Sequence, residues 1–301
     1  MQLPQRVTIK EVGPRDGLQN ETAVMPTQTK IALVDKLSAT GLKYIEVSSF
    51  VNPKWIPALG DATDVFSAIT RRPGVQYSAL VPNTRGLESA LAAQVDAVNV
   101  FMSASESHNL KNINKSIADT FPVLKAVVEQ AKAVGLPVRG YVSTVFGCPY
   151  EGPVTLDNVK RVATALLDMG VDELSLGDTI GVAVPKQVVE VVGELAKEMP
   201  LEKLALHFHD TRGMAIANIW AGLNAGITVF DASVGGLGGC PYAPGASGNV
   251  ATEDTLYLFH RMGVETDVDE GAVLATVAWL EEAIGRTVNS HARAVVRGAK
   301  S

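Results

Sequence analysis

Two histidines separated by one residue end an apolar run, in the segment Leu204-Ala-Leu-His207-Phe-His209-Asp210. Side chains at positions i and i+2 of an extended strand point to the same face, so His207 and His209 are expected to direct two imidazoles at one place. Such a pair needs only a carboxylate to complete a common metal-binding set. The alternative is one buried structural histidine and one surface histidine, because so short a motif often occurs without a metal.

Asp16 is the candidate carboxylate, because it lies in the loop that follows the first predicted strand. With His207 and His209 it would form the facial set that holds an octahedral divalent metal and leaves positions open. Asn249 could add an amide oxygen. These mixed ligands predict Mg²⁺ or Mn²⁺, although Co²⁺ or Zn²⁺ could also occupy the site. The alternative for Asp16 is an ion pair with Arg15, which we disfavour because adjacent residues rarely face each other.

A glycine-rich segment at 235–249 is the second unusual feature, with six glycines in fifteen residues and a thiol at Cys240. So much glycine costs backbone entropy, which makes a purely structural role unfavourable. We therefore predict a mobile lid that brings Cys240 to the site as a nucleophile, acid or base. The alternative is a loop that binds phosphate at the start of the next helix.

Alternating strands and helices position these residues. Apolar and β-branched runs predict strands at 7–12, 44–48, 75–81, 97–101, 138–145, 173–176, 204–208 and 228–233. Amphipathic runs predict one helix after each strand, at 27–40, 62–70, 84–93, 117–134, 156–169, 185–198, 214–225 and 250–262.

Eight strand–helix units in about 260 residues match the size and order of a (β/α)8 TIM barrel, in the α/β class. The competing open doubly wound sheet is disfavoured because no Gly-x-Gly-x-x-Gly turn follows the first strand. We assign residues 1–265 to a catalytic barrel domain. Residues 266–301 are expected to form a C-terminal helical extension of the same domain, with one or two extra helices at about 266–284 and a small, basic tail at 286–301.

Polar residues gather where such a barrel places its active site, at the C-terminal ends of the strands. They are Arg15, Asp16, Glu46, Ser48, Ser103, Glu106, Arg139, Ser143, Asp178, Thr179, His207, His209, Asp210, Cys240 and Asn249. Glu46 and Asp178 are candidates for orienting a metal ligand or Arg15. Their alternative role is a structural polar network inside the barrel.

Composition excludes several classes of protein. The chain has 301 residues, 47% of them hydrophobic and 19% charged, which is typical of a folded globular protein. Its net charge of −6 offers no footprint for nucleic acid or an anionic membrane. No apolar run is long enough to span a bilayer, and two cysteines are too few for a disulfide framework. We expect neither a secretory nor a transit peptide at the N-terminus.

Several longer motifs resemble the 3-hydroxy-3-methylglutaryl-CoA lyases. They are Glu11-Val-Gly-Pro-Arg-Asp-Gly-Leu-Gln-Asn-Glu21, Ser48-Ser-Phe-Val-Asn-Pro-Lys-Trp55, Lys111-Asn-Ile-Asn114, Arg139-Gly-Tyr-Val142, Gly147-Cys-Pro-Tyr-Glu-Gly152, Ser175-Leu-Gly-Asp-Thr-Ile-Gly181 and the loop 235–253. The resemblance runs from about residue 7 to 285. The related isopropylmalate and homocitrate synthases share the Arg-Asp-Gly and His-x-His elements but lack the cysteine loop.

The resemblance implies cleavage of 3-hydroxy-3-methylglutaryl-CoA to acetyl-CoA and acetoacetate, the last step of leucine breakdown. The metal, held by Asp16, His207, His209 and Asn249, would chelate the substrate hydroxyl and carboxylate and ease deprotonation of the hydroxyl. The resemblance assigns to His207 a role as base or proton relay.

Four further positions take roles from the family. Arg15 would bind the substrate and stabilise the enolate oxygen, and Cys240 would close over the site and transfer a proton. Glu46 and Asp178 correspond to supporting positions. We expect Arg15→Gln to remove most activity with little effect on folding.

Animal mitochondrial members of the family carry a targeting segment, and some carry a regulatory cysteine near the C-terminus. The C-terminal residues 297–301 of this sequence contain no cysteine. We therefore expect a cytoplasmic, bacterial-type enzyme without thiol regulation, which acts as a homodimer or higher homo-oligomer. Three alternatives stay open: a lyase for a bulkier substrate such as the isohexenyl analogue, an acyl-CoA-dependent synthase, and a silent barrel that binds CoA esters.

Overall fold

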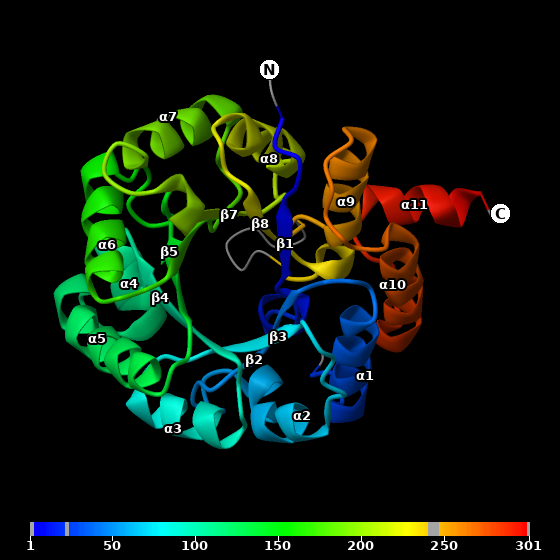
Figure 1. Ribbon diagram of the computed structural model, residues 1–301, viewed down its shortest axis with the longest axis horizontal. Coiled ribbons are helices and arrows are strands. Elements are labelled where there is room, and N and C mark those ends of the chain that lie inside the picture. The colour runs from blue at the N-terminus through cyan, green and yellow to red at the C-terminus, as the bar shows by residue number, and fades with distance from the viewer. Residues whose placement is uncertain (1–2, 22–23, 240–246, 300–301) are drawn as a thin grey trace.

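Eight parallel strands close into a barrel in the computed structural model, which describes residues 3–21, 24–239 and 247–299 (Figure 1). Each strand pairs with its neighbours in the sequence, and β1 also pairs with β8 to close the sheet. The strands are β1 (Thr8–Glu11), β2 (Tyr44–Ser49), β3 (Gln76–Leu80), β4 (Ala97–Ser103), β5 (Val138–Ser143), β6 (Glu173–Asp178), β7 (Leu204–Phe208) and β8 (Val229–Ala232). The predicted TIM barrel is confirmed.

Helices surround the barrel on all sides (Figure 1). They are α1 (Thr27–Ser38), α2 (Ala62–Ala68), α3 (Thr84–Ala92), α4 (Glu106–Ile113), α5 (Ile117–Ala133), α6 (Leu156–Asp168), α7 (Pro185–Leu195), α8 (Ala215–Asn224), α9 (Thr252–Arg261), α10 (Glu270–Ile284) and α11 (His291–Gly298). The eight predicted strands and the eight helices predicted after them all occur, with every boundary within three residues of the expectation.

Helix α6 shows how the sequence forms these outer helices. Thr155 caps its N-terminus by accepting a hydrogen bond from the backbone N–H of Asn158. Val159, Val162 and Leu166 recur at intervals of three and four residues and are fully or almost fully buried. This spacing lines up one apolar face, which packs on β5 and β6.

Strand β2 shows the other half of the pattern, because all six of its residues are buried. A strand of a parallel barrel has helices on its outer side and other strands' side chains on its inner side. Glu46 and Ser48 are therefore buried although they are polar, with Glu46 entirely inaccessible to solvent. A carboxylate in that position needs partners within the barrel.

Two helices were not among the predicted elements. Helix α4 spans only eight residues between β4 and α5, and Ser105 caps it by accepting from the N–H of His108. Helix α11 forms in the basic tail, where Ser290 is the cap. Helices this short carry little periodicity, so their caps are the more informative signal.

The C-terminal segment packs directly on the barrel helices. α10 contacts α1 and α9, and α11 contacts α9 and α10. Glu281 of α10 forms ion pairs with Arg293 and Arg297 of α11. We propose on this ground that 266–301 extends the barrel domain and is not a second domain.

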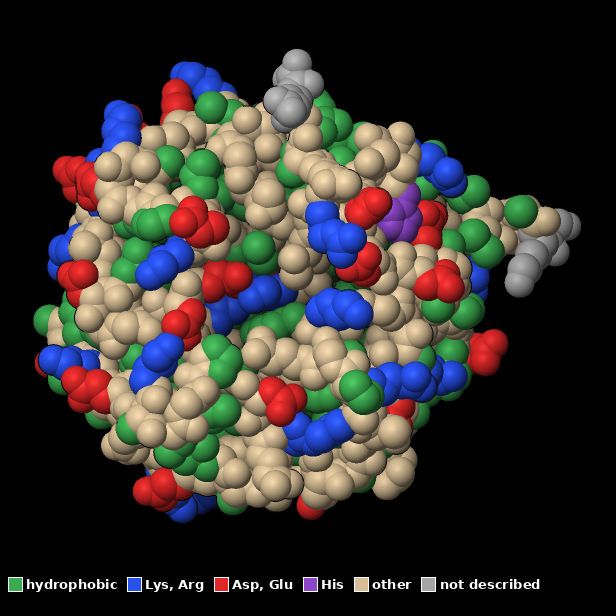
Figure 2. All heavy atoms as spheres, viewed as in Figure 1, with side chains coloured by type: hydrophobic (Ala, Val, Ile, Leu, Met, Phe, Trp, Pro, Cys, Tyr) green, Lys and Arg blue, Asp and Glu red, His purple; other side chains and the backbone are tan. Residues whose placement is uncertain are grey.

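The space-filling view presents one face of the barrel with its ring of helices. Acidic and basic side chains gather in a hollow at the centre of that face (Figure 2). Within the described parts of the chain, no helix is both long and apolar enough to cross a membrane.

Candidate active site

Asp16, His207 and His209 converge as the histidine spacing predicts. One ligand atom from each residue lies within 4.8 Å of the others. The rings of His207 and His209 have centroids 5.3 Å apart, which is the same-face arrangement expected at positions i and i+2. His207 belongs to β7, whereas His209 follows it and forms an isolated bridge with Asn249.

A tight turn brings Asp16 to the histidines. β1 runs into a π-helical turn, Gly13–Gly17, in which the carbonyl of Val12 accepts from the N–H groups of Arg15, Asp16 and Gly17. The turn has no room for a larger residue at position 13, because a Cβ there would lie 2.6 Å from Glu11 Oε1. π-helical turns are rare and often occur at functional sites.

Asp16 and His209 have the protonation states that a metal needs. In His207, by contrast, burial lowers the pKa but Asp231 and Asp16 raise it above its ordinary value. Burial alone would raise the pKa of Asp16, but the charge of Arg15 and the two imidazoles lower it to about 2. Burial and the neighbouring His207 lower the pKa of His209 to about 4, so this imidazole is neutral at pH 7. An ionised carboxylate and a neutral imidazole are the forms that bind divalent metals.

An orphaned ring nitrogen also fits a metal. Nδ1 of His209 is buried and has no hydrogen-bond partner among the described residues. A buried polar nitrogen without a partner costs about 1–3 kcal/mol, a cost that a ligand bound at this atom would remove. The donor set therefore fits a divalent metal, as predicted.

Arg15 lies beside this cluster with its guanidinium held on two sides. Nε and Nη2 contact Glu46 Oε2 at 2.8 and 2.7 Å. Nη1 donates to Asp16 Oδ1 at 2.7 Å, so the expectation that adjacent Arg15 and Asp16 would not pair is wrong. The π-helical turn is the physical reason, because it places these neighbours side by side.

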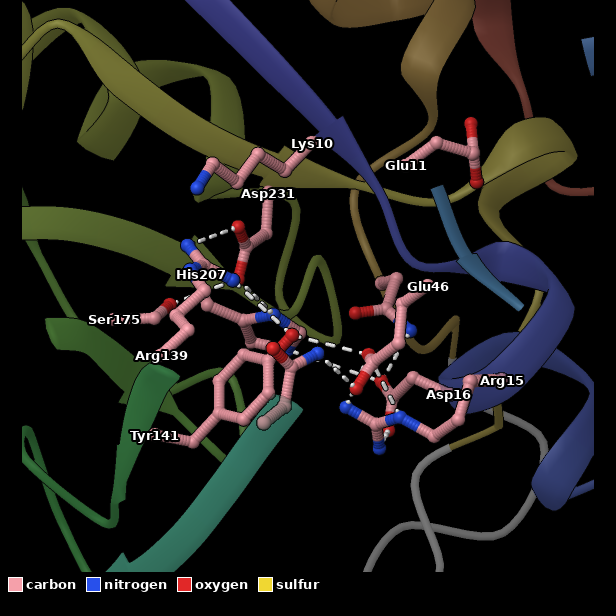
Figure 3. Close-up of polar contacts among 12 residues, drawn as sticks. Lys10, Glu11, Arg15, Asp16, Glu46, Arg139, Tyr141, Ser175, His207 and Asp231 are labelled. Atoms are coloured by element: carbon pink, nitrogen blue, oxygen red, sulfur yellow. Dashed lines mark hydrogen bonds and ion pairs between the residues drawn. The ribbon is translucent and has the colours of Figure 1, made fainter. Parts of the chain in front are cut away.

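Glu46 is one of the two predicted supporting carboxylates, and it accepts a hydrogen bond from Arg15. Besides Arg15, its oxygens accept from Tyr141 Oη at 3.0 Å and from Asn99 Nδ2 at 2.7 Å. Donors from β4, β5 and the first loop thus fix the carboxylate, and it in turn fixes the guanidinium (Figure 3).

Asp178, the other predicted supporting carboxylate, bonds elsewhere. Its oxygens accept from the backbone N–H groups of Val182 and Ala183, at 2.9 and 3.1 Å. They organise the loop after β6, and no hydrogen bond from Asp178 to Arg15 or to a candidate ligand is found among the described residues. Burial raises the pKa of Asp178 to about 6.

Asn249 holds the predicted carboxylate ligand in place. Its Nδ2 donates to Asp16 Oδ2 at 2.8 Å and to the carbonyl of Leu237 at 3.1 Å. Both amide protons are used, which leaves Oδ1 as the atom that a metal could take. Cys240, the thiol of the predicted lid, lies outside the described residues.

Sequence reasoning missed the carboxylate that contacts His207. Asp231 Oδ2 lies 3.2 Å from His207 Nδ1 and also accepts from Arg139 and Ser175 (Figure 3). The sequence places Arg139 among the polar strand residues and in a family motif, but it gives no sign of the contact with Asp231. The available signal was a charged residue in the middle of a short buried strand, Val229-Phe-Asp231-Ala232.

A cavity of about 730 Å³ opens above the cluster. The residues that line it include Arg15, Asp16, Tyr141, His207 and His209. Trp55, which is 72% exposed, lines the cavity as well. A cavity of this size holds a ligand comparable with a drug molecule or a cofactor.

A buried glutamate connects the two loops that meet at the site. Glu11 Oε1 accepts from the N–H groups of Gly13 and Val234, and Oε2 accepts from Thr252 Oγ1. Burial raises the pKa of Glu11 to about 7, against an ordinary value of 4.5. The folded protein therefore keeps a proton that the unfolded chain releases between these pH values.

The contribution of Glu11 to the free energy of unfolding should be fully present below pH 4.5 and should be lost as the pH rises to about 7. Glu11→Gln preserves the shape but cannot titrate. We expect the unfolding free energy of the wild type to fall more than that of Glu11→Gln between about pH 5 and pH 8, because only the wild type loses this contribution. Urea denaturation at a series of pH values measures the difference, and parallel curves would contradict it.

Comparisons with known proteins show the family to which the chain is similar. A model of the HMGL-like family matches residues 6–279. A hydroxymethylglutaryl-CoA lyase of Bacillus subtilis is 55% identical over 290 residues, which are 96% of this chain and 97% of that protein.

Two further relatives extend the comparison. A Pseudomonas aeruginosa lyase named for 3-hydroxy-3-isohexenylglutaryl-CoA and hydroxymethylglutaryl-CoA is 50% identical over 97% of both chains. The solved structure of an Acinetobacter baumannii HMG-CoA lyase, in complex with coenzyme A and 3-methylmalate, is similar with a TM-score of 0.91. It is 39% identical, and the match covers 95% of this chain and 94% of that one.

Proposed function

The chain belongs to the HMGL-like family, and from that premise we propose that it cleaves 3-hydroxy-3-methylglutaryl-CoA to acetyl-CoA and acetoacetate, in leucine breakdown. It is a carbon–carbon lyase. The observation that carries the proposal is the convergence of Asp16, His207 and His209 in the lining of a cavity, with the Arg15 guanidinium beside them.

Three residues would hold a divalent metal here: Asp16 through a carboxylate oxygen, and His207 and His209 through ring nitrogens. Asn249 is proposed as a fourth ligand through Oδ1. Mg²⁺ or Mn²⁺ suits this mixed set, and Co²⁺ or Zn²⁺ could replace it. When bound, the metal supplies Lewis acidity that makes the substrate's tertiary hydroxyl easier to deprotonate.

Arg15 supplies positive charge where negative charge develops. Breaking the C2–C3 bond converts the hydroxyl-bearing carbon to a ketone and leaves an enolate on the acetyl-CoA thioester. The guanidinium is fixed by Glu46 before substrate arrives, so it can stabilise the enolate oxygen without reorganising. Glu46 thus supports the reaction through Arg15, and Asp178 supports it through the loop after β6.

His207 has one nitrogen left for chemistry, because Nδ1 contacts Asp231 and Nε2 lies 3.9 Å from Asp16 Oδ2. A nitrogen that binds a metal cannot also accept a proton. Of the two roles implied by the family, ligand and base, we therefore favour the ligand. We propose on sequence grounds that Cys240 closes over the substrate and transfers the proton, which its thiolate accepts from the substrate hydroxyl and returns to the enolate carbon to give acetyl-CoA.

The direct test is product analysis. Purified protein treated with a chelator is supplied with Mg²⁺ or Mn²⁺, a reduced thiol and 3-hydroxy-3-methylglutaryl-CoA, and both products are quantified. We expect acetyl-CoA and acetoacetate in equal amounts, with no turnover before metal is added. Absence of turnover with either metal would refute the proposal.

The Pseudomonas relative supports a second substrate, 3-hydroxy-3-isohexenylglutaryl-CoA, because that lyase is named for both acyl-CoA esters. Discrimination by one methylene is worth only about 1–3 kcal/mol, so a pocket with room for a longer chain discriminates weakly. We propose the methyl substrate as the preferred one. Competition between the two substrates in one reaction measures the ratio of kcat/KM, and an excess of isohexenyl cleavage would reverse the assignment.

Two features of the protein stay predictions from the sequence. One is its location in the cytoplasm, which the bacterial relative suggests. The other is assembly into a homodimer or higher homo-oligomer, which size-exclusion chromatography with light scattering would measure.

A further inference from the structure

Asp231 and His207 are neighbours across two strands. Their Cα atoms are paired in the register between β7 and β8, and both side chains are largely or fully buried. The carboxylate approaches the imidazole on the Nδ1 side, at 3.2 Å (Figure 3). On the other side of the ring, Nε2 lies 3.9 Å from Asp16 Oδ2. The two ring nitrogens of His207 therefore face different partners.

Both carboxylate oxygens of Asp231 accept hydrogen bonds, and the groups that contact them act as donors. Arg139 donates from Nη2 to Oδ1 at 2.7 Å and from Nη1 to Oδ2 at 3.1 Å. Ser175 Oγ donates to Oδ2 at 2.8 Å. A carboxylate paired in this bidentate way with a guanidinium acts as an acceptor. The proton in the contact with His207 must therefore be on Nδ1.

Arg139 cannot easily move away from Asp231, because it is held from the opposite direction. Nε donates to Glu173 Oε1 at 2.5 Å, and Lys10 Nζ donates to the same oxygen at 2.8 Å. The guanidinium also lies over the Tyr141 ring, at 5.0 Å from its centroid. These contacts form a row of alternating charges, each paired with the next, in the order Lys10, Glu173, Arg139 and Asp231.

We propose that Asp231 is a positioning residue, which keeps His207 in the Nδ1–H tautomer and so presents the Nε2 lone pair to a divalent metal at Asp16 and His209. This inference rests on the metal site of the proposed function. A carboxylate behind a ligating histidine fixes its ring and increases its basicity, and loss of such a partner weakens metal binding about 10- to 100-fold. Nothing in the His-x-His motif itself selects the tautomer.

The test compares two neutralising changes in the same row of charges. Asp231→Asn removes the charge that contacts His207, whereas Glu173→Gln removes a charge whose ion pairs within the described part of the chain are with Arg139 and Lys10. Metal-free proteins are titrated with Mn²⁺, and free Mn²⁺ is measured by electron paramagnetic resonance. We expect affinity to fall about 10- to 100-fold in Asp231→Asn and to stay within about threefold in Glu173→Gln.

The tautomer itself is read from nitrogen chemical shifts of ¹⁵N-histidine-labelled wild-type protein without metal. The spectra are recorded at a pH above the pKa of His207, which burial lowers but Asp231 and Asp16 raise above its ordinary value. The chain has five histidines, and the His207 signals are assigned by their loss in His207→Gln. We expect protonated Nδ1 and unprotonated Nε2. This measurement needs no Asp231 variant, so it stays decisive if Asp231→Asn does not fold.

Several results would overturn the inference. They are an Nε2–H tautomer in the wild type, unchanged Mn²⁺ affinity in Asp231→Asn, and an equal loss in Glu173→Gln, which would indicate a general effect of charge. In each of these cases wild-type Mn²⁺ binding would leave the proposed function intact. Wild-type protein that binds no Mn²⁺ would instead refute the proposed metal site and this inference together.

Discussion

Arg15→Gln is expected to lower kcat about 10²- to 10³-fold, the usual cost of removing one group that stabilises a developing oxyanion. The reason is that the guanidinium is fixed beside the candidate ligands by Glu46 and Asp16 before any substrate binds. Steady-state kinetics with 3-hydroxy-3-methylglutaryl-CoA measure the loss. Because the contact matters in the transition state, kcat should fall more than KM rises.

The structure changes the expected effect of this substitution on folding. Glu46 is entirely buried, and without Arg15 its charge loses the cation that balances it. Removing one partner of a buried pair costs about 3–5 kcal/mol, so Arg15→Gln should be clearly less stable than the wild type. The sequence names Glu46 as a candidate partner of Arg15 but does not show that its carboxylate is entirely buried, which is why little effect on folding was expected.

A double variant separates stability from catalysis. Arg15→Gln combined with Glu46→Gln removes both charges, so we expect it to regain much of the lost stability. It should regain none of the turnover, because the guanidinium is still absent. Near wild-type kcat in either protein would contradict the role assigned to Arg15.

His209→Ala is expected to abolish metal binding and to lower the activity by at least about 10³-fold. The metal-free protein should lose no stability from a broken hydrogen bond at Nδ1. The buried Nδ1 of His209 has no partner among the described residues, so deleting the imidazole breaks no polar contact at this atom. Without His209, only Asp16 and His207 remain of the three proposed metal ligands.

Thermal and chemical denaturation give a readout that does not depend on activity. A metal at about 100 times its Kd stabilises the folded wild type by about 2.7 kcal/mol, and His209→Ala should gain nothing from the same addition. His260→Ala is the matched control, because His260 bonds to Glu270 and Thr266 and does not line the cavity. A metal-dependent gain in His209→Ala equal to that of the wild type would show that the ligand set is wrong.

Much of the fold could be predicted from the sequence because strands and helices alternate with clear periodicity. The spacing of His207 and His209 predicted their common face, and the barrel topology then brought Asp16 to them from β1. These are consequences of strand geometry and chain order, which local sequence patterns report well.

The contacts that tune the site could not be predicted in the same way. The pairing of Arg15 with Asp16 depends on a rare π-helical turn, and the contact of Asp231 with His207 depends on the register between two strands. Asp178 lies at the expected strand end but bonds to its own loop. Register and side-chain direction are set by the packing of the whole barrel, which no single motif contains.

Anomalous diffraction at the manganese absorption edge, from crystals of the protein loaded with Mn²⁺, tests the central claim most directly. We predict one strong peak, bound by Asp16, His207 and His209, at about 2.0–2.3 Å from a carboxylate oxygen and two ring nitrogens. A second crystal of His209→Ala under the same conditions should lack this peak. No peak between these three residues in the wild type, or a manganese ion bound only elsewhere on the protein, would contradict the account.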